Sequence, residues 1–213
     1  MATPPDRPIL LHRMAISGHS HRVELFLSLL GLPVQLVDVS LPTGEHKKPA
    51  FLQLNEFGQV PVIQDGDVTL ADSNAILVYL ASRYAPDPDA WLPRDPVHAA
   101  HVQRWLSVAA GQLAFGASAA RAIVLFNKPT PADDAIQRAH ALLKVMDGVL
   151  AKSAYLTGDR PTLADIANYS YTAHAPEGRV SLDDYAHVRA WLARIEALPG
   201  FVPMRKTPSQ QAA

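Results

Sequence analysis

Ser17, Val60-Pro61 and Asp72-Ser73 are the residues whose types and positions could serve chemistry, because each stands where one secondary-structure pattern gives way to another. A serine at the start of a helix offers a hydroxyl for catalysis, but its commonest role there is to cap the helix, and Ser20 could do the same. Pro61 could be an edge-strand proline, and Asp72-Ser73 an ordinary capping pair. Taken one at a time, these residues favour the structural interpretations.

The chain of 213 residues contains no cysteine. This excludes disulfides, thiolate zinc sites, iron–sulfur clusters and catalysis by a protein thiol, so any sulfur chemistry must use a sulfur that a ligand brings. His19 with His21, and His98 with His101, have spacings that could suit a metal. No cysteine or carboxylate cluster at ligand spacing completes either pair, so we predict no metal site.

Composition and charge bound the class of protein. Hydrophobic residues make up 48% and charged residues 18%, which is typical of a globular domain and excludes disorder. With 19 basic and 20 acidic residues the chain has no overall field to attract nucleic acid or anionic lipid, so we expect neither as a partner. We find no apolar run near the ~20 residues of a membrane helix and no secretory signal, which favours a cytoplasmic location.

The N-terminal part predicts a β-α-β-(α)-β-β-α order over residues 8–84. Hydrophobic periodicity and turn formers place the elements in these ranges: strand 9–14, helix 23–30, strand 34–39, a short helix 49–54, strands 60–64 and 67–71, and a helix from 72 to 84. Arg22, Glu24 and Ser28 fall on the polar side of the first helix. Asp65-Gly66 suits a type I′ hairpin turn.

The rest of the chain predicts helices only. The proline-rich stretch 85–96 indicates a linker, and apolar stripes at helical spacing follow from Val102 to Ile195. We expect Trp105, Phe115, Tyr169 and Tyr171 to lie in the core, with a ligand pocket as the alternative. Thr162 and Asp165 form a capping-box pattern, which favours a structural role for both. A small-residue run, 109–120, suits a subunit contact or a cleft wall.

Six segments together resemble the soluble glutathione S-transferases, and they span nearly the whole chain. They are 17–23 (SGHSHRV), 44–52 (GEHKKPAFL), 55–62 (NEFGQVPV), 72–76 (DSNAI), 157–167 (TGDRPTLADIA) and 198–200 (LPG). The resemblance is to a bacterial, Ser-type, theta/delta-like transferase. It implies an α/β plus all-α fold, with a thioredoxin-like glutathione-binding domain over 1–84, a linker over 85–96, and an all-helical electrophile-pocket domain over 97–213.

The resemblance also implies a glutathione site. Val60 would pair its backbone with the cysteinyl peptide of glutathione through a cis peptide at Pro61. Asp72 and Ser73 would hold the γ-glutamyl ammonium and carboxylate at a helix N-terminus, where an anion is favoured. Gln59 would add a polar contact, and His46 would face the glycyl end. Lys47-Lys48 is expected to be a solvated pair, with attraction of the glycyl carboxylate as the alternative.

Ser17 would then be the catalytic hydroxyl. A hydrogen bond from Ser17 to the glutathione sulfur, near a helix start, would stabilise the thiolate, and Ser20 or a nearby amide is the alternative donor. The absence of cysteine, and of tyrosine within residues 9–23, leaves only a serine type. Glu56 and Asn74 depart from the family pattern, so we expect the polar contacts around glutathione to differ in detail.

The function that follows is an enzyme, a glutathione transferase with glutathione as co-substrate and no metal. It would add the thiolate to small apolar electrophiles or reduce peroxides, and it would form a homodimer. The alternative is a non-catalytic glutathione-binding, ligand-binding or protein-interaction module of the same fold. The sequence does not identify the electrophile.

Overall fold

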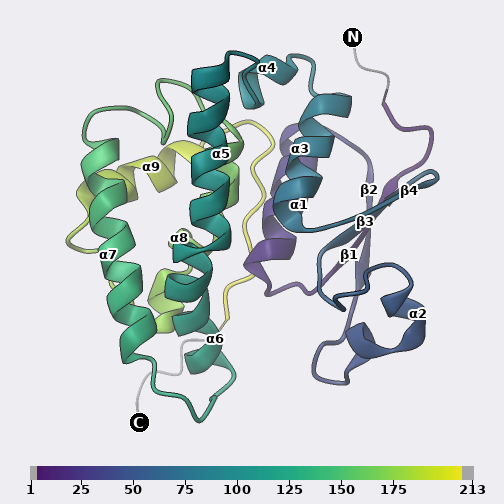
Figure 1. Ribbon diagram of the computed structural model, residues 1–213, viewed down its shortest axis with the longest axis horizontal. Coiled ribbons are helices and arrows are strands. Elements are labelled where there is room, and N and C mark those ends of the chain that lie inside the picture. The colour runs from purple at the N-terminus through teal and green to yellow at the C-terminus, as the bar shows by residue number, and fades with distance from the viewer. Residues whose placement is uncertain (1–3, 208–213) are drawn as a thin grey trace. The chain divides into compact units, whose positions relative to one another are not determined.

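The strand patterns of the N-terminal part come together in one four-stranded sheet, drawn at the right of Figure 1. The strands are β1 (Ile9–Arg13), β2 (Val34–Asp38), β3 (Val62–Asp65) and β4 (Val68–Ala71), in the order β2-β1-β3-β4. β1 pairs in parallel with β2 and antiparallel with β3, and β3 is antiparallel to β4. This is the thioredoxin-like arrangement that the family resemblance implied.

The computed structural model describes residues 4–207, which divide into two compact units. The first unit runs to Leu92 and takes in Leu198–Arg205. The second comprises Pro93–Ala197 with Lys206 and Thr207. The boundaries drawn from the sequence at 84 and 97 stay a prediction.

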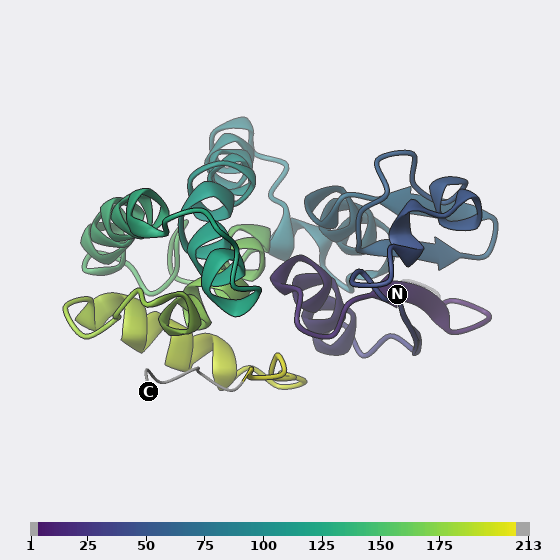
Figure 2. The same cartoon turned by 90° about the horizontal axis from the view of Figure 1, so that it is seen from below.

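Helices cover the sheet of the first unit on both faces. α1 (Gly18–Leu29) and α3 (Ser73–Tyr84) lie on one face, while the one-turn α2 (Pro49–Leu52) lies on the other with the preceding η1 (Glu45–Lys47), as Figures 1 and 2 show. Side chains on both faces of the sheet are buried. The neighbouring residues Val62 and Ile63 point to opposite faces, and both are fully buried. Val62 packs with Val39 and Phe51 beneath α2.

The hairpin between β3 and β4 differs from the predicted turn. Asp65 pairs with Val68, so Gly66 and Asp67 are the two turn residues, one position later than expected. Gly66 has a φ of 56°, but Asp67 is not among the described non-glycine residues with positive φ. A type I′ turn needs positive φ at both central residues, so that prediction was wrong.

The stretch predicted as a linker contains a further helix, α4 (Pro88–Trp91). The Trp91 ring packs edge-on against Phe26 of α1, with 4.9 Å between ring centroids. This part of the chain is therefore packed into the first unit as far as Leu92.

The second unit is helical, as expected. Its helices are α5 (Pro96–Ala110), the π-helical η2 (Ala114–Ser118), α6 (Ala119–Leu125), α7 (Asp133–Leu150), α8 (Leu163–Ala173), the 3₁₀ turn η3 (Ala175–Gly178) and α9 (Ala186–Glu196). The small-residue run allows close packing at Gly116, where an added Cβ would lie 3.0 Å from the Ala139 nitrogen. Trp105, Tyr169 and Tyr171 are buried, but Phe115 is 68% exposed, so its expected place in the core was wrong.

The capping-box pattern has the structural role that was expected. The Asp165 carboxylate is fully buried and accepts hydrogen bonds from the backbone N–H groups of Leu156 and Thr162, at 2.9 and 2.8 Å. It also accepts from the Trp191 indole, 2.9 Å away. Asp165 therefore ties the start of α8 to α9 and to the preceding turn.

One described segment is long and apolar enough to cross a membrane by length and composition, which the sequence reading did not find. It runs over Pro96–Leu125 with a mean hydropathy of 1.5 in its most apolar window, and a third of that window is buried. Its backbone is interrupted at Gly116, whose φ and ψ are not helical. Core helices of soluble proteins meet the same criterion.

Candidate active site

Ser17 is the N-cap of α1, where the chain leaves the sheet after β1. Its Oγ accepts a hydrogen bond from the backbone N–H of Ser20, with 3.3 Å between oxygen and nitrogen. Ser20 is 1% exposed, and its own Oγ accepts from the Met14 backbone N–H, also at 3.3 Å. Ser17 is half-buried, so it is the more accessible of the two hydroxyls.

Each serine oxygen receives a fixed N–H, and a hydroxyl has one hydrogen to donate. The Ser17 hydrogen is therefore available to an acceptor beside the start of α1. The capping interpretation of Ser17 is confirmed, and it leaves the donor free for chemistry because capping uses only the oxygen lone pair.

The Val60–Pro61 peptide is cis, as expected. It stands immediately before β3, where Pro61 and Val62 are buried and Val60 is half-buried. Within residues 4–207, no hydrogen bond engages the backbone N–H or C=O of Val60. Val60 thus offers a donor and an acceptor at the end of the sheet strand.

The loop before Val60 is held by Asn55, which the sequence reading did not single out. Asn55 is 3% exposed, and its Nδ2 donates to the Gln59 carbonyl over 2.8 Å. Its Oδ1 accepts from the Phe57 backbone N–H, 3.1 Å away. The Gln59 side chain itself is exposed, so it is available to a ligand.

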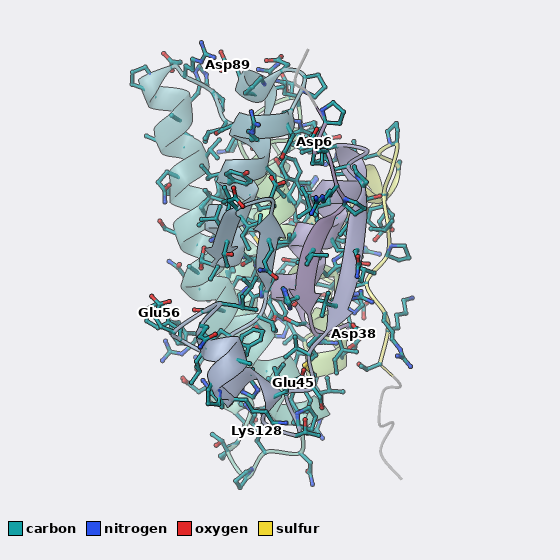
Figure 3. The ribbon with its side chains drawn as sticks, turned by 90° about the vertical axis from the view of Figure 1, so that its right-hand side faces the viewer. Asp6, Asp38, Glu45, Glu56, Asp89 and Lys128 are labelled. Carbon is teal, nitrogen blue, oxygen red and sulfur yellow. The ribbon has the colours of Figure 1, made fainter. Side chains whose placement is uncertain are left out.

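His46 lies in η1, close to the same loop. Its Nδ1 is buried and has no hydrogen-bond partner within the described part of the chain. Gly58 packs tightly here, since an added Cβ would lie 2.6 Å from the His46 carbonyl oxygen. Lys47 donates to the Phe57 carbonyl over 2.9 Å, so it is engaged with the loop and is not simply solvated. Figure 3 shows Glu45 and Glu56 on the segments that flank α2, at one end of the unit.

Asp72 caps α3 in an unusual conformation. Its Oδ1 accepts from the backbone N–H groups of Asn74 and Ala75, each 2.9 Å away, while its side chain stays exposed. Its φ is 68°, in the left-handed region that non-glycine residues rarely adopt. Strained conformations of this kind cluster at functional sites.

Ser73 is joined to α1 by Arg22. The Arg22 guanidinium is fully buried, and its Nη1 donates to Ser73 Oγ at 3.2 Å and to Asn74 Oδ1 at 2.8 Å. His19 Nδ1 lies 3.4 Å from the same Ser73 oxygen. Burial, and the charge of Arg22, lower the pKa of His19 to about 3, so its ring is neutral at neutral pH.

The sequence pattern placed Arg22 on the exposed side of α1, which was wrong. α1 is buried on most of its surface, from Gly18 to Leu27, because it packs against both the sheet and α3. The only signal in the sequence is that Arg22 directly precedes Val23, the first residue of the apolar stripe of this helix.

The predicted residues therefore fall into three bonded groups. Ser17 pairs with Ser20 at the start of α1, Ser73 joins α1 through Arg22, and Gln59 belongs to the loop that packs against η1. In the part of the chain that the structure describes, no direct hydrogen bond links Ser17 to Val60 or to Asp72.

The histidine pairs considered as metal ligands have other partners. His21 Nε2 lies 2.9 Å from the Val202 carbonyl, and His98 Nδ1 lies 2.7 Å from the Asp95 carboxylate. Over residues 4–207 there is no group of three or more histidine or carboxylate side chains placed to hold a metal ion.

Comparison with known proteins finds relatives of both parts of the chain. Residues 16–83 match the glutathione S-transferase N-terminal domain, and residues 113–199 match the glutathione S-transferase C-terminal domain. The chain is 37% identical to glutathione S-transferase 3 of Zea mays, over 96% of this chain and 99% of that protein. The chain therefore belongs to the glutathione S-transferase family.

Solved structures show the same fold along the chain. A glutathione S-transferase from Pseudomonas fluorescens superposes with a TM-score of 0.87 and 31% identity, covering 94% of this chain and all of that one. A glutathione transferase homologue from Drosophila mojavensis, solved with bound glutathione, gives a TM-score of 0.81 and 28% identity, covering 90% and 89% of the two chains.

Proposed function

We propose that this chain is a glutathione transferase in which Ser17 stabilises the glutathione thiolate. The observation that carries the proposal is the Ser17 hydroxyl at the N-terminus of α1, half-buried, with its oxygen occupied by the Ser20 N–H and its hydrogen left to donate. A free thiol has a pKa of about 8.5, and a hydrogen bond to the thiolate at the positive end of a helix lowers it.

The chemistry is attack by the thiolate sulfur on an electrophile. The thiol loses its proton, and the sulfur forms a bond to the electrophilic carbon. In a substitution the leaving group departs with its electron pair, and in an addition the product takes up a proton. The proposed substrates are small apolar electrophiles, with peroxide reduction at the expense of glutathione as a related activity.

Glutathione would be held along the end of the sheet. The backbone groups of Val60 fit the cysteinyl peptide like an added strand, because no other hydrogen bond in residues 4–207 engages them. The exposed Asp72 carboxylate suits the γ-glutamyl ammonium, and Ser73 at the start of α3 suits its carboxylate. Gln59 and the buried Nδ1 of His46 would serve the remaining peptide and the glycyl end.

We propose further that the enzyme is of the Ser type, theta/delta-like, that it works in the cytoplasm, and that it uses no metal. We also propose a homodimer. The apolar segment Pro96–Leu125 has only a third of its most apolar window buried within the chain, and Phe115 and Val97 are 68% and 62% exposed. A second copy of the chain could bury this surface, and a two-fold dimer is the commonest closed assembly.

Retention on immobilised glutathione, followed by conjugation assays with a panel of small electrophiles and peroxides, tests this function. We expect glutathione-eluted retention and turnover of at least one electrophile. Retention without turnover of any electrophile or peroxide would favour the non-catalytic binding module, and no retention would contradict glutathione as the ligand.

A further inference from the structure

Arg22 is a fully buried cation, and two of its hydrogen bonds reach residues at the start of α3. One nitrogen, Nη1, donates both to Ser73 Oγ and to Asn74 Oδ1. Burying a guanidinium is costly unless it is well bonded, so a charge kept here needs a reason beyond packing. Two of its acceptors are therefore Ser73, the proposed carboxylate ligand, and the neighbouring Asn74.

The direction of these bonds fixes the polarity of Ser73. Arginine has no acceptor, so the Ser73 oxygen must accept from Arg22 and its single hydrogen must be donated elsewhere. His19 Nδ1 lies 3.4 Å from the Ser73 oxygen, and the neutral ring can accept this hydrogen in the tautomer that carries its own hydrogen on Nε2. A hydroxyl held in this way is prepared to donate to an anion and is poorly suited to an ammonium.

We infer that Arg22 is a positioning residue that makes Ser73 a hydrogen-bond donor and thereby sets the preference of this enzyme for the α-carboxylate of the γ-glutamyl group. The inference rests on the proposed function, in which glutathione binds at the start of α3. Asn74 supports it, because Arg22 holds the Asn74 side chain by its oxygen while Asp72 holds the Asn74 backbone N–H.

The neighbouring Asp72 has the opposite polarity. Its carboxylate is exposed and can only accept, whereas Ser73 is held as a donor by the buried cation. Two adjacent residues thus present an acceptor and a donor, which is the pattern that an amino-acid zwitterion requires. Arg22 provides the donor part of this pattern, because its hydrogen bond orients the Ser73 hydroxyl.

The test compares two peptides by calorimetry, glutathione and γ-aminobutyryl-cysteinylglycine, which lacks only the α-carboxylate. The full-length protein should prefer glutathione by about tenfold to a hundredfold, the usual effect of a charge-assisted hydrogen bond. In Arg22→Met this preference should fall by about tenfold or more, because the Ser73 hydroxyl can then rotate. Affinity for the peptide without the carboxylate should change little.

Ser73→Ala should reduce the preference as much as Arg22→Met, and the double variant should show no further loss. Arg121→Met is the matched control, since Arg121 is also buried but bonds Glu177 in the second unit. It should lose stability and keep the preference. Arg22→Lys keeps the charge and should retain part of the preference for glutathione. This variant replaces Arg22→Met in the experiment if the methionine variant does not fold.

Equal weakening of both peptides in Arg22→Met would mean a merely structural role and would overturn the inference. So would a Ser73→Ala variant that keeps the parent preference, a result that does not depend on whether any Arg22 variant folds. A parent protein that binds neither peptide would instead contradict the proposed function itself.

Discussion

The backbone N–H of Ser20 donates to Ser17 Oγ across the first turn of α1, at 3.3 Å, and leaves the Ser17 hydrogen for another acceptor. Ser73 at the start of α3 has the same polarity, since its oxygen accepts from the Arg22 guanidinium. Two helix N-termini therefore each present a hydroxyl donor, and both suit groups that carry negative charge. In the proposed complex these groups are the glutathione sulfur and the γ-glutamyl carboxylate.

Replacing Asp72 by Asn should weaken glutathione binding while the protein stays folded. Asparagine can still cap α3 and tolerates the positive φ of this position, but it removes the charge that would pair with the ligand ammonium. We expect the dissociation constant to rise by about tenfold or more, measured by calorimetry.

Asp95→Asn is the control for that experiment, because Asp95 caps α5 with the same pattern of two backbone N–H groups. It should leave glutathione affinity unchanged. An Asp72→Asn protein that binds like the parent would mean that Asp72 is only a cap.

The half-buried His19 should make stability depend on pH. Its pKa is about 3 in the folded protein and 6.5 in the unfolded chain, so the unfolded chain binds the proton first as the pH falls. The free energy of unfolding should therefore decrease as the pH drops below about 6.5, by no more than about 1.4 kcal/mol per pH unit from this residue. His19→Asn should flatten this slope in urea titrations.

The exposed His101 provides the comparison, and His101→Asn should keep the parent slope. His174, whose pKa is also lowered chiefly by burial, stays in every variant and contributes equally. Identical slopes for the parent and His19→Asn would show that His19 is not held neutral.

Asp165→Asn should destabilise the protein without a direct effect on the glutathione site. An amide offers one acceptor oxygen where the carboxylate has two, so a buried N–H of Leu156, Thr162 or Trp191 would lose its partner. We expect a loss of about 2–4 kcal/mol in the free energy of unfolding, measured in urea at a temperature where the variant is folded. Unchanged stability would contradict the structural role.

The protein should be a dimer in solution. Light scattering should give twice the chain mass of 23.1 kDa, and Phe115→Asp should shift the mass toward the monomer if this exposed ring lies in the contact. A monomer mass for the parent at micromolar concentration would rule out the proposed assembly.

Most of the fold could be predicted from local patterns. The strands β1 and β2 and the helix ends at Leu29 and Tyr84 lie within a residue or two of the predicted positions, because apolar periodicity and Gly-Leu-Pro or Pro-rich stops mark them. The hairpin turn was displaced by one residue, since the cross-strand pair of Asp65 with Val68 depends on register, which a turn dipeptide does not fix.

The site was predictable where a residue's role follows from its place at an element boundary. Ser17 and Asp72 are such residues, and the structure confirms that both cap helices. Arg22 and Asn55 were not predictable, because their roles depend on contacts between elements, α1 with α3 and loop with loop. The prediction that Phe115 lies in the core was wrong for the same reason, since helical spacing does not show which face of a helix a neighbouring element covers.

The pKa of the thiol in bound glutathione tests the central claim most directly. Thiolate absorbance against pH should give a value about one to two units below the free thiol in the parent, because one charge-assisted hydrogen bond has that effect. Ser17→Ala should return the pKa toward about 8.5, Ser17→Thr should restore it, and Ser20→Ala should leave it low. A thiol pKa that is unchanged in Ser17→Ala, or that rises only in Ser20→Ala, would contradict the role of Ser17.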